Sequence, residues 1–229
     1  MSALPLKRVS ILTNFSDFQA AYSLNIIVQG QIKMLVNHGY QPVVIVSDTF
    51  TAPEDTPYHL EGVTLKFLPI VPVYNEVKKD ETFDEDVQAL EMGLEDALKD
   101  IDVVLSHDII YQNACLKHNL ASRKYAAKHP QVKWLHWIHS ATSPITLANL
   151  RPYFGDEYLN LVQKPFPNSL YVFFNDYSKP RIAMDFGIDE ALVKTVHHPT
   201  DVYEFFGIAQ EVQGVMEDKK MLESDVMCT

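Results

Sequence analysis

Glycine is scarce in this sequence, which has 8 glycines among 229 residues, none of them in a G-x-G-x-x-G or Walker-type loop. Such loops hold a phosphate through backbone N–H groups, which approach the anion closely only where there is no side chain. A standard phosphate-binding loop is therefore excluded.

Cysteine is equally rare. Cys115 falls in a helical pattern and Cys228 lies next to the last residue, so the two do not form a disulfide framework, which fits a reducing cytoplasm. The N-terminal apolar run is too short for a signal peptide, and no apolar run approaches the length of a membrane span. We expect a cytoplasmic protein with no integral membrane segment.

Basic residues are outnumbered, with 19 Lys and Arg against 30 Asp and Glu, and the formal net charge is -11. This charge argues against nucleic acid or an anionic membrane as the main partner, because both attract positively charged surfaces. The hydrophobic fraction of 47% is ordinary for a globular protein that buries a full core.

Apolar runs of strand length alternate with helical stripes along the chain. We expect strands at residues 7–13, 42–47, 63–68, 102–106, 132–138, 170–174 and 192–196. We expect helices at about residues 21–38, 82–98, 109–128 and 178–187. Runs that are apolar throughout are typical of strands buried on both faces. This order predicts an α/β fold, a Rossmann-like open parallel sheet with helices on both faces.

The start of the second predicted helix carries two overlapping motifs. Thr82-x-x-Glu85 predicts a capping box. Residues 84–86, Asp-Glu-Asp, also match the D-x-D signature of metal-dependent sugar transfer. We reject that match, because acidic residues in the first turn of a helix complement its dipole and no apolar strand precedes them.

The aromatic strand at 132–138 runs directly into a polar loop. In open α/β sheets ligands bind where strands end at their carboxyl edge, so His139 and Ser140 lie where chemistry is expected. Strand alternation places His136 and His139 on opposite faces, so they should not bind one metal together. We predict that His139 is the functional histidine; the structural alternative is a strand-end histidine bonded to a backbone carbonyl.

The sequence near the end of the chain predicts a domain boundary after residue 200. An amphipathic helical pattern starts at about residue 201, and residues 225–229 have the character of a new buried strand. A strand needs neighbours, and the sequence that follows would have to supply them. We expect residues 1–200 to form the Rossmann-like domain, and residues 201–229 to hold a linker helix and the start of a missing donor-binding domain. The exposed terminal strand would favour self-association.

Four segments carry a resemblance to a known family. They are "LVNHGYQPVVIVSD" at 35–48, "DIDVVLSHD" at 100–108, "WLHWIHS" at 134–140 and "VFFNDYSKPRIAMDFGIDEALVKTVHHPTDVYEFFG" at 172–207. Their order resembles the N-terminal, acceptor-side domain of GT-B glycosyltransferases, in particular glycosyltransferase family 4. The chain departs from that family after the first strand, where residues 14–21 replace its glycine pair, and at residues 197–200, which replace its asparagine-glycine turn.

The resemblance implies a retaining sugar transferase in which His139 contacts the donor sugar. It implies no metal and no other cofactor, since the nucleotide-sugar is a co-substrate held mainly by the missing C-terminal domain; the acceptor is unknown and the isolated chain would be inactive. Residues at strand ends and in loops would bind substrate. These are Asn14, Phe15, Ser16, Asp17, His107, Asp108, Ser140, Arg151, Asn175 and Asp201, the last matching the aspartate of the family motif.

Two other functions stay open. A non-catalytic binding or interaction domain is consistent with the lack of glycine-rich loops and of a complete catalytic set. A metal-dependent hydrolase would draw on His107, Asp108, His139 and His197, all at predicted strand ends, although no H-x-x-x-H or H-E-x-x-H motif supports it.

Overall fold

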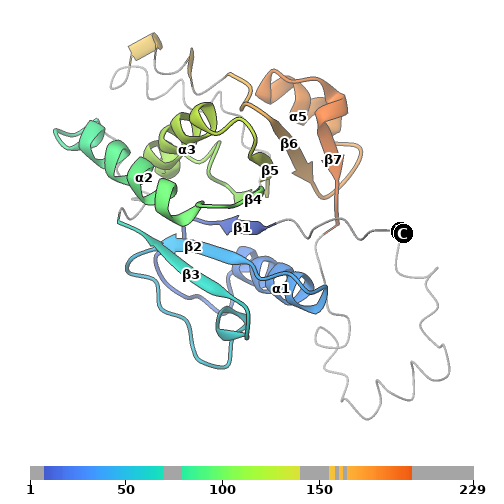
Figure 1. Cartoon of the computed structure of the whole chain (residues 1–229). Helices are drawn as coiled ribbons and strands as arrows, with labels where there is room; N and C mark the ends of the chain where they lie inside the picture. The colour runs from blue at the N-terminus through green and yellow to red at the C-terminus, as the bar shows by residue number, and fades with distance from the viewer. Residues whose placement is uncertain (1–7, 70–78, 140–154, 158–159, 162–163, 198–229) are drawn as a thin grey trace. The chain divides into compact units, whose positions relative to one another are not determined.

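The computed structural model describes residues 8–69, 79–139, 155–157, 160–161 and 164–197. Within these ranges lie seven parallel strands and four helices (Figure 1), and residues 155–157 and 160–161 are also helical. The strands are β1 (Val9–Leu12), β2 (Val43–Ser47), β3 (Thr64–Leu68), β4 (Val103–His107), β5 (Lys133–Trp137), β6 (Ser169–Phe173) and β7 (Val193–Thr195). The helices are α1 (Ser23–Asn37), α2 (Phe83–Ala97), α3 (Leu116–Lys128) and α5 (Lys179–Phe186). Short 3-10 turns are η1 (Pro57–His59), η2 (Asn113–Cys115) and η4 (Glu190–Leu192).

The strands form one sheet in the order β3-β2-β1-β4-β5-β6-β7. The chain therefore builds outward from β1 in one direction as far as β3, and then crosses back to place β4 on the other side of β1. This reversal leaves a crevice at the carboxyl ends of β1 and β4, which is where ligands bind in doubly wound sheets. The predicted Rossmann-like open parallel sheet is confirmed.

Helices cover both faces of the sheet, as predicted (Figure 1). On one face α1 packs its buried stripe against Ile11, Val44 and Leu105 of the central strands. On the other face α2, α3 and α5 enclose a larger cluster that includes Leu12 and Trp134. Strand residues alternate between the two clusters because successive side chains of a strand point to opposite faces.

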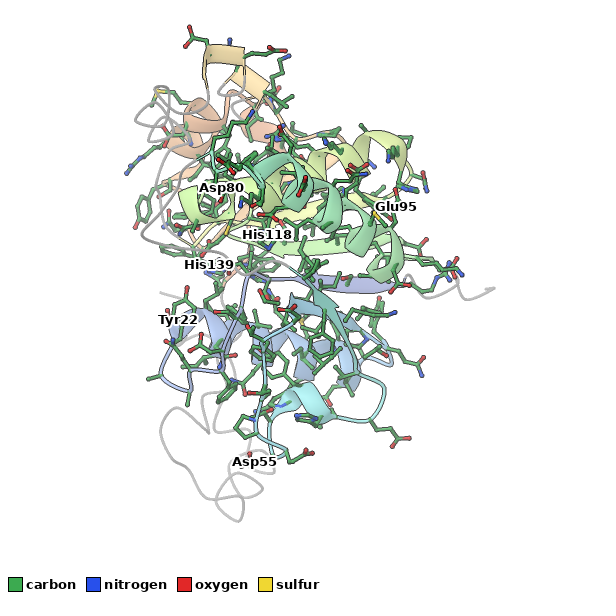
Figure 2. The ribbon with its side chains drawn as sticks, turned by 90° about the vertical axis from the view of Figure 1, so that its left-hand side faces the viewer. Tyr22, Asp55, Asp80, Glu95, His118 and His139 are labelled. Atoms are coloured by element: carbon green, nitrogen blue, oxygen red, sulfur yellow. The ribbon has the colours of Figure 1, made fainter. Side chains whose placement is uncertain are left out.

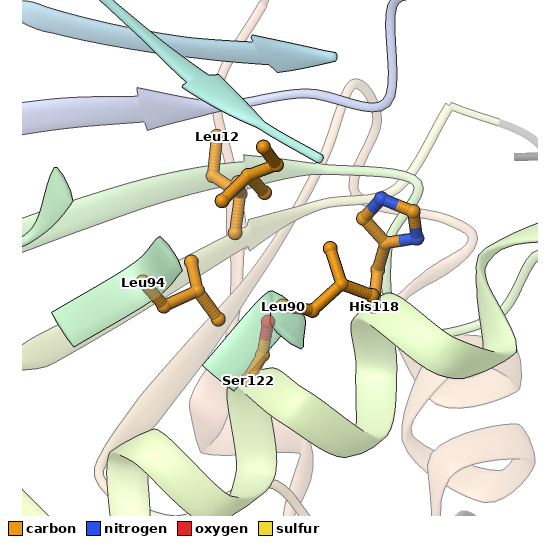
Figure 3. A pocket seen from close by; sticks show the side chains of 6 residues that line it. Leu12, Leu90, Leu94, His118 and Ser122 are labelled. Atoms are coloured by element: carbon orange, nitrogen blue, oxygen red, sulfur yellow. The ribbon is translucent and has the colours of Figure 1, made fainter. Parts of the chain in front are cut away.

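The core under α2 and α3 is tightly packed (Figure 3). Leu90 and Leu94 of α2 meet Leu12 of β1, and His118 and Ser122 of α3 face the same space. The space between these side chains has no room for a water molecule. Close packing of this kind fixes α3, and with it the loop from β4 that precedes it.

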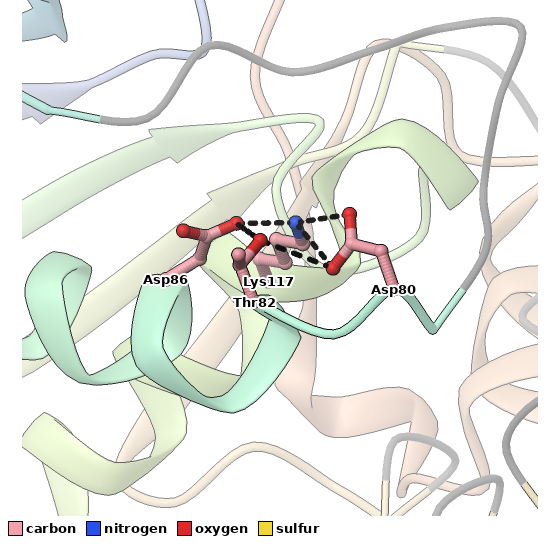
Figure 4. A network of polar contacts seen from close by, with 4 residues as sticks. All are labelled: Asp80, Thr82, Asp86 and Lys117. Atoms are coloured by element: carbon pink, nitrogen blue, oxygen red, sulfur yellow. Dashed lines mark hydrogen bonds and ion pairs between the residues drawn. The ribbon is translucent and has the colours of Figure 1, made fainter.

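An ion-pair network joins α2 to α3 (Figure 4). The Lys117 ammonium lies 3.3 Å from a carboxylate oxygen of Asp80 and also pairs with Asp86. Thr82 donates through its hydroxyl to Asp80 and to Asp86, both at 3.3 Å. The capping box predicted for Thr82 and Glu85 is therefore wrong, because the Thr82 side chain makes no cap hydrogen bond to the helix backbone. The acidic first turn of α2 binds a lysine instead.

The start of α3 also differs from the prediction. The sequence predicts a helix from residue 109, whereas α3 begins at Leu116. Asp108 has a φ of 60°, in the left-handed region, so the chain turns sharply after β4 and cannot continue into a helix there. The turn closes through a hydrogen bond from the Gln112 N–H to the Asp108 carbonyl.

Outside the gaps noted above, none of the helices has the length and apolar character that crossing a bilayer requires.

Candidate functional site

Two histidines meet at the carboxyl edge of the sheet. His107 ends β4 and His139 follows β5, and their ring nitrogens Nδ1 and Nε2 lie 2.8 Å apart. The rings are nearly parallel, with centroids 5.1 Å apart, and the ring of Trp137 also stacks with His107, with centroids 5.9 Å apart. His107 is fully buried and His139 is half-buried, and the Nδ1 atom of His139 is itself buried.

Helix α1 supplies the third member of this chain. The Oε1 atom of Gln31 lies 2.9 Å from Nε2 of His107, and Gln31 is only 1% exposed. In this arrangement His107 donates from Nε2 to Gln31, so its Nδ1 accepts a hydrogen bond from Nε2–H of His139. The same bond leaves Nδ1 as the unprotonated nitrogen of a neutral His139 ring. Gln31 thus sets the tautomer of a histidine that it does not touch.

A second contact holds the backbone at the same point. The backbone N–H of His139 donates to the Tyr111 hydroxyl at 3.0 Å, and that hydroxyl donates to Oδ1 of Asp108. Tyr111 is 1% exposed and Asp108 is 6% exposed. His139 is therefore fixed at its ring by the last residue of β4 and at its backbone by Tyr111, which follows β4.

The buried carboxyl of Asp108 is an unusual acid. Burial raises the pKa of Asp108 to about 7, and the backbone N–H of His139 acts in the opposite direction. A carboxyl that changes protonation near neutral pH, beside a half-buried histidine, is typical of a functional site.

Asn14 connects β1 to the same region. Its Nδ2 donates to the sulfur of Cys115 at 3.0 Å, and both side chains are buried. Burial raises the pKa of the Cys115 thiol to about 12, so the thiol stays protonated at neutral pH and is no nucleophile. The contact ties the loop after β1 to the turn before α3.

The loop after β1 forms an open hollow of about 160 Å³. Phe15 is buried beneath it, whereas Ser16 and Asp17 lie at its surface together with Gln19 and Tyr22. Thr49 donates its hydroxyl to the Ser16 carbonyl at 2.9 Å, which anchors the loop to the segment after β2.

The loop also rests on a buried pair of polar side chains. Asn25 donates through Nδ2 to the Gln19 carbonyl at 3.0 Å, and Tyr58 donates its hydroxyl to Oδ1 of Asn25 at 2.7 Å. Burial raises the pKa of Tyr58, which therefore remains a donor at any ordinary pH.

The opposite face of β5 carries a different histidine. Ser106 Oγ and His136 Nδ1 are 2.6 Å apart, and His136 packs against Trp134 and Phe166. Burial, followed by the charge of Arg123, lowers the pKa of His136 to about 3, so the ring is neutral. The predicted separation of His136 and His139 onto opposite faces is confirmed, and His136 belongs to the core.

The structure brings together part of the predicted site. Asn14, His107, Asp108 and His139 are linked directly or through one intermediate residue, and the hollow adjoins Asn14. Asn175 lies at the end of β6, where its Oδ1 accepts a hydrogen bond from the Ser178 N–H at the start of α5. Ser140, Arg151 and Asp201 lie outside the described residues, as do the helix predicted from residue 201 and the strand predicted at 225–229.

The sequence analysis missed Gln31, Tyr111, Cys115 and Tyr22. One signal existed for Gln31, because it is a polar residue on the stripe of α1 that carries Ile27, Val28 and Ile32, and that stripe is buried. The others follow from turns whose geometry no pattern in the sequence encodes.

In the part of the chain that the structure describes, no group of three or more His, Cys, Asp or Glu side chains is arranged to hold a metal ion. His107 and His139 are hydrogen-bonded to each other, and the exposed His197 follows β7, which lies at the edge of the sheet.

No family model and no curated protein match the sequence. Among solved structures the chain is similar to sucrose-phosphate synthase from Thermosynechococcus elongatus, with a TM-score of 0.52 and 12% identity over 83% of this chain. The match covers 48% of that protein, so the chain spans about half its length. A short-chain dehydrogenase/reductase from Veillonella parvula DSM 2008 gives a TM-score of 0.38 and 13% identity, covering 75% of this chain and 73% of that one. The first similarity is one of fold.

Proposed function

We propose that this chain is the acceptor-side domain of a retaining glycosyltransferase that moves a sugar from a nucleotide-sugar to an acceptor. The observation that carries the proposal is the position of His139, at the tip of β5 beside the crevice between β1 and β4, with its ring and backbone both fixed. The fold similarity to sucrose-phosphate synthase supports the same class of reaction.

His139 would bind a hydroxyl of the transferred sugar. During transfer, positive charge develops at the anomeric carbon and negative charge on the leaving phosphate, so a polar group held rigidly at this point favours the transition state. The chain Gln31–His107–His139 supports that rigidity, because both nitrogens of the His107 ring and Nε2 of the His139 ring lie within hydrogen-bond distance of a partner.

The donor nucleotide would be held by a second domain of the GT-B type. Basic side chains and a helix N-terminus of such a domain would neutralise the diphosphate, so no metal is required. Tested alone, the 229-residue chain would bind the acceptor but would not catalyse sugar transfer.

The decisive experiment is a sugar-nucleotide turnover assay on this chain and on a longer protein that includes a donor domain, each with His139→Ala. We expect activity only in the longer protein, and a loss of at least about 100-fold when His139 is removed. His38→Ala is the matched control, because His38 is an exposed histidine just beyond the far end of α1.

Two outcomes would change the proposal. Normal turnover after His139→Ala would keep the reaction class and remove the role of His139. An inert longer protein, tested across nucleotide-sugars, would favour a non-catalytic binding domain instead.

A further inference from the structure

The hollow after β1 differs in charge from a site built for an anion. Six residues line it: Asn14, Phe15, Ser16, Asp17, Gln19 and Tyr22. The only formal charge among them is the negative charge of Asp17. Below the hollow, Asp108 lies close enough to Tyr22 for its charge to raise the pKa of the Tyr22 hydroxyl, after the larger effect of burial.

The N-terminus of α1 attracts anions, but the negative charges near the hollow outweigh this attraction. Helix α1 begins directly after Tyr22, which lines the hollow, and the N-terminus of a helix is equivalent to about half a positive charge. Asp17 carries a full negative charge, and Asp108 adds a second one above its pKa of about 7. A phosphate placed in the hollow would therefore meet net repulsion at neutral pH.

The polar groups of the hollow suit hydroxyl groups, which both donate and accept. Each oxygen of the Asp17 carboxylate already accepts one hydrogen bond, from Ser16 Oγ at 3.3 Å and from Gln19 Nε2 at 2.8 Å. A carboxylate has about four acceptor positions, so Asp17 can accept further hydroxyl protons from a ligand. Its orientation is fixed before the ligand arrives.

An aromatic ring forms one wall. The Tyr22 ring packs edge-on against the buried Phe15 ring, with centroids 6.0 Å apart and an interplanar angle of 65°. Phe15 stacks in turn on Phe50 at 6.3 Å. Tyr22 is nevertheless 39% exposed, so the supported ring presents an apolar surface at the hollow. The C–H face of a sugar ring packs well on such a surface.

We propose that this hollow binds a neutral polyol, the ring of a sugar or cyclitol, with Tyr22 against its C–H face and Asp17 accepting its hydroxyl protons. The inference deepens the proposed function, on which it rests, by naming the acceptor class: a neutral polyol, as opposed to a phosphorylated or carboxylated one. Figure 2 shows Tyr22 and His139 at the same side of the molecule, which is where acceptor and transferred sugar would meet.

The test is a binding comparison on the full chain, by calorimetry or ligand-observed NMR. The probes are glucose, fructose and myo-inositol, each beside its phosphate monoester. We expect at least one neutral probe to bind with a Kd on the order of 1 mM, and its phosphate ester to bind at least about tenfold more weakly. Tyr22→Ala should weaken the neutral probe about tenfold. Tyr177→Ala, which removes a tyrosine that is 84% exposed near the end of β6, should leave binding unchanged.

A second variant separates charge from shape. Asp17→Asn removes the negative charge and replaces one of the two acceptor oxygens with a donor, so it should strengthen phosphate-ester binding several-fold while weakening binding of the neutral probe. Tighter binding of the esters than of the neutral probes in the unmodified chain would overturn the inference and leave the transferase proposal standing. Binding of the neutral probes that is unchanged by Tyr22→Ala would also overturn the inference, as would the absence of any binding. Tyr22-dependent binding of a neutral probe with no turnover in the longer protein would instead remove the transferase proposal and keep this site.

Discussion

The ring nitrogens of His107 and His139 lie 2.8 Å apart, so the two imidazoles share one proton between them. Only one of the two facing nitrogens can carry it, and the choice is made by Gln31 on the far side of His107, 2.9 Å away. Which nitrogen of the half-buried His139 ring carries the proton therefore depends on a buried amide of α1 that His139 does not touch.

Gln31→Leu is the direct test of that dependence. The change leaves Nε2–H of His107 buried with no acceptor from α1, so we expect the free energy of unfolding to fall by about 1–3 kcal/mol. The ¹⁵N shifts of His139 should also change, because its tautomer is no longer fixed. Gln88→Leu is the control, since Gln88 is an exposed glutamine on α2 and its replacement should cost less than about 0.5 kcal/mol. Equal effects of the two substitutions would contradict the role given to Gln31.

Asp108→Asn should alter how stability depends on pH. The folded pKa of Asp108 is raised to about 7 from an unfolded value of 3.8, so between these values the folded state keeps a proton that the unfolded state releases. The contribution of Asp108 therefore falls as pH rises, by about 1.4 kcal/mol per pH unit over this interval. Asparagine is neutral and tolerates the left-handed backbone of residue 108, so the variant should gain stability relative to the unmodified protein as pH increases. Urea unfolding at several pH values measures the difference, and parallel curves for the two proteins would refute the assignment.

His136 should stay neutral through the ordinary pH range. Its pKa is lowered from 6.5 to about 3, so the unfolded state binds a proton that the folded state does not, and stability from this residue rises with pH over that interval. The sign is opposite to that of Asp108, and the two contributions offset each other where the intervals overlap. Imidazole NMR shifts of His136 should show no titration between about pH 4 and pH 8. A midpoint near 6.5 would show that the ring is more open to water than the structure has it.

Lys117→Met should weaken the packing of α2 against α3 by removing the ion-pair network between them. Lys117 is 21% exposed at its side chain, pairs with Asp80 and Asp86 and lies 5.4 Å from the centroid of the Phe83 ring. Because the lysine is largely buried within a network, we expect a loss of about 1 kcal/mol in the free energy of unfolding. Lys124→Met is the comparison, since Lys124 is 55% exposed and its pair with Glu91 is longer, at 3.8 Å. That substitution should change stability by less than about 0.5 kcal/mol, and a reversed ranking would contradict the network's role.

Much of the fold follows from hydrophobic pattern alone. The strands predicted at residues 42–47 and 63–68 differ by one residue from β2 and β3, and the helix predicted at 178–187 becomes α5 with Gly187 just past its end, in the left-handed conformation. These elements are predictable because each buries a face whose period is visible in the sequence. The start of α3 was not predictable in this way, since it depends on the backbone angle of Asp108.

The site was predictable only in outline. The rule that strand ends carry function located His107 and His139 separately, but their contact depends on β4 and β5 being neighbours in the sheet. Strand order is a property of the packed domain and leaves no periodic mark in the sequence. Predicting the contact between Gln31 and His107 would also require knowing which face of the sheet α1 covers.

The histidine chain joins segments that are far apart in sequence. The contact between His107 and His139 closes 32 residues, whereas the contact between Gln31 and His107 closes 76. The entropic cost of closing a loop grows slowly with its length, so the contact between Gln31 and His107 carries the larger cost of the two. The His107 ring therefore cross-links three segments that are distant in sequence: the end of β4, the end of β5 and helix α1.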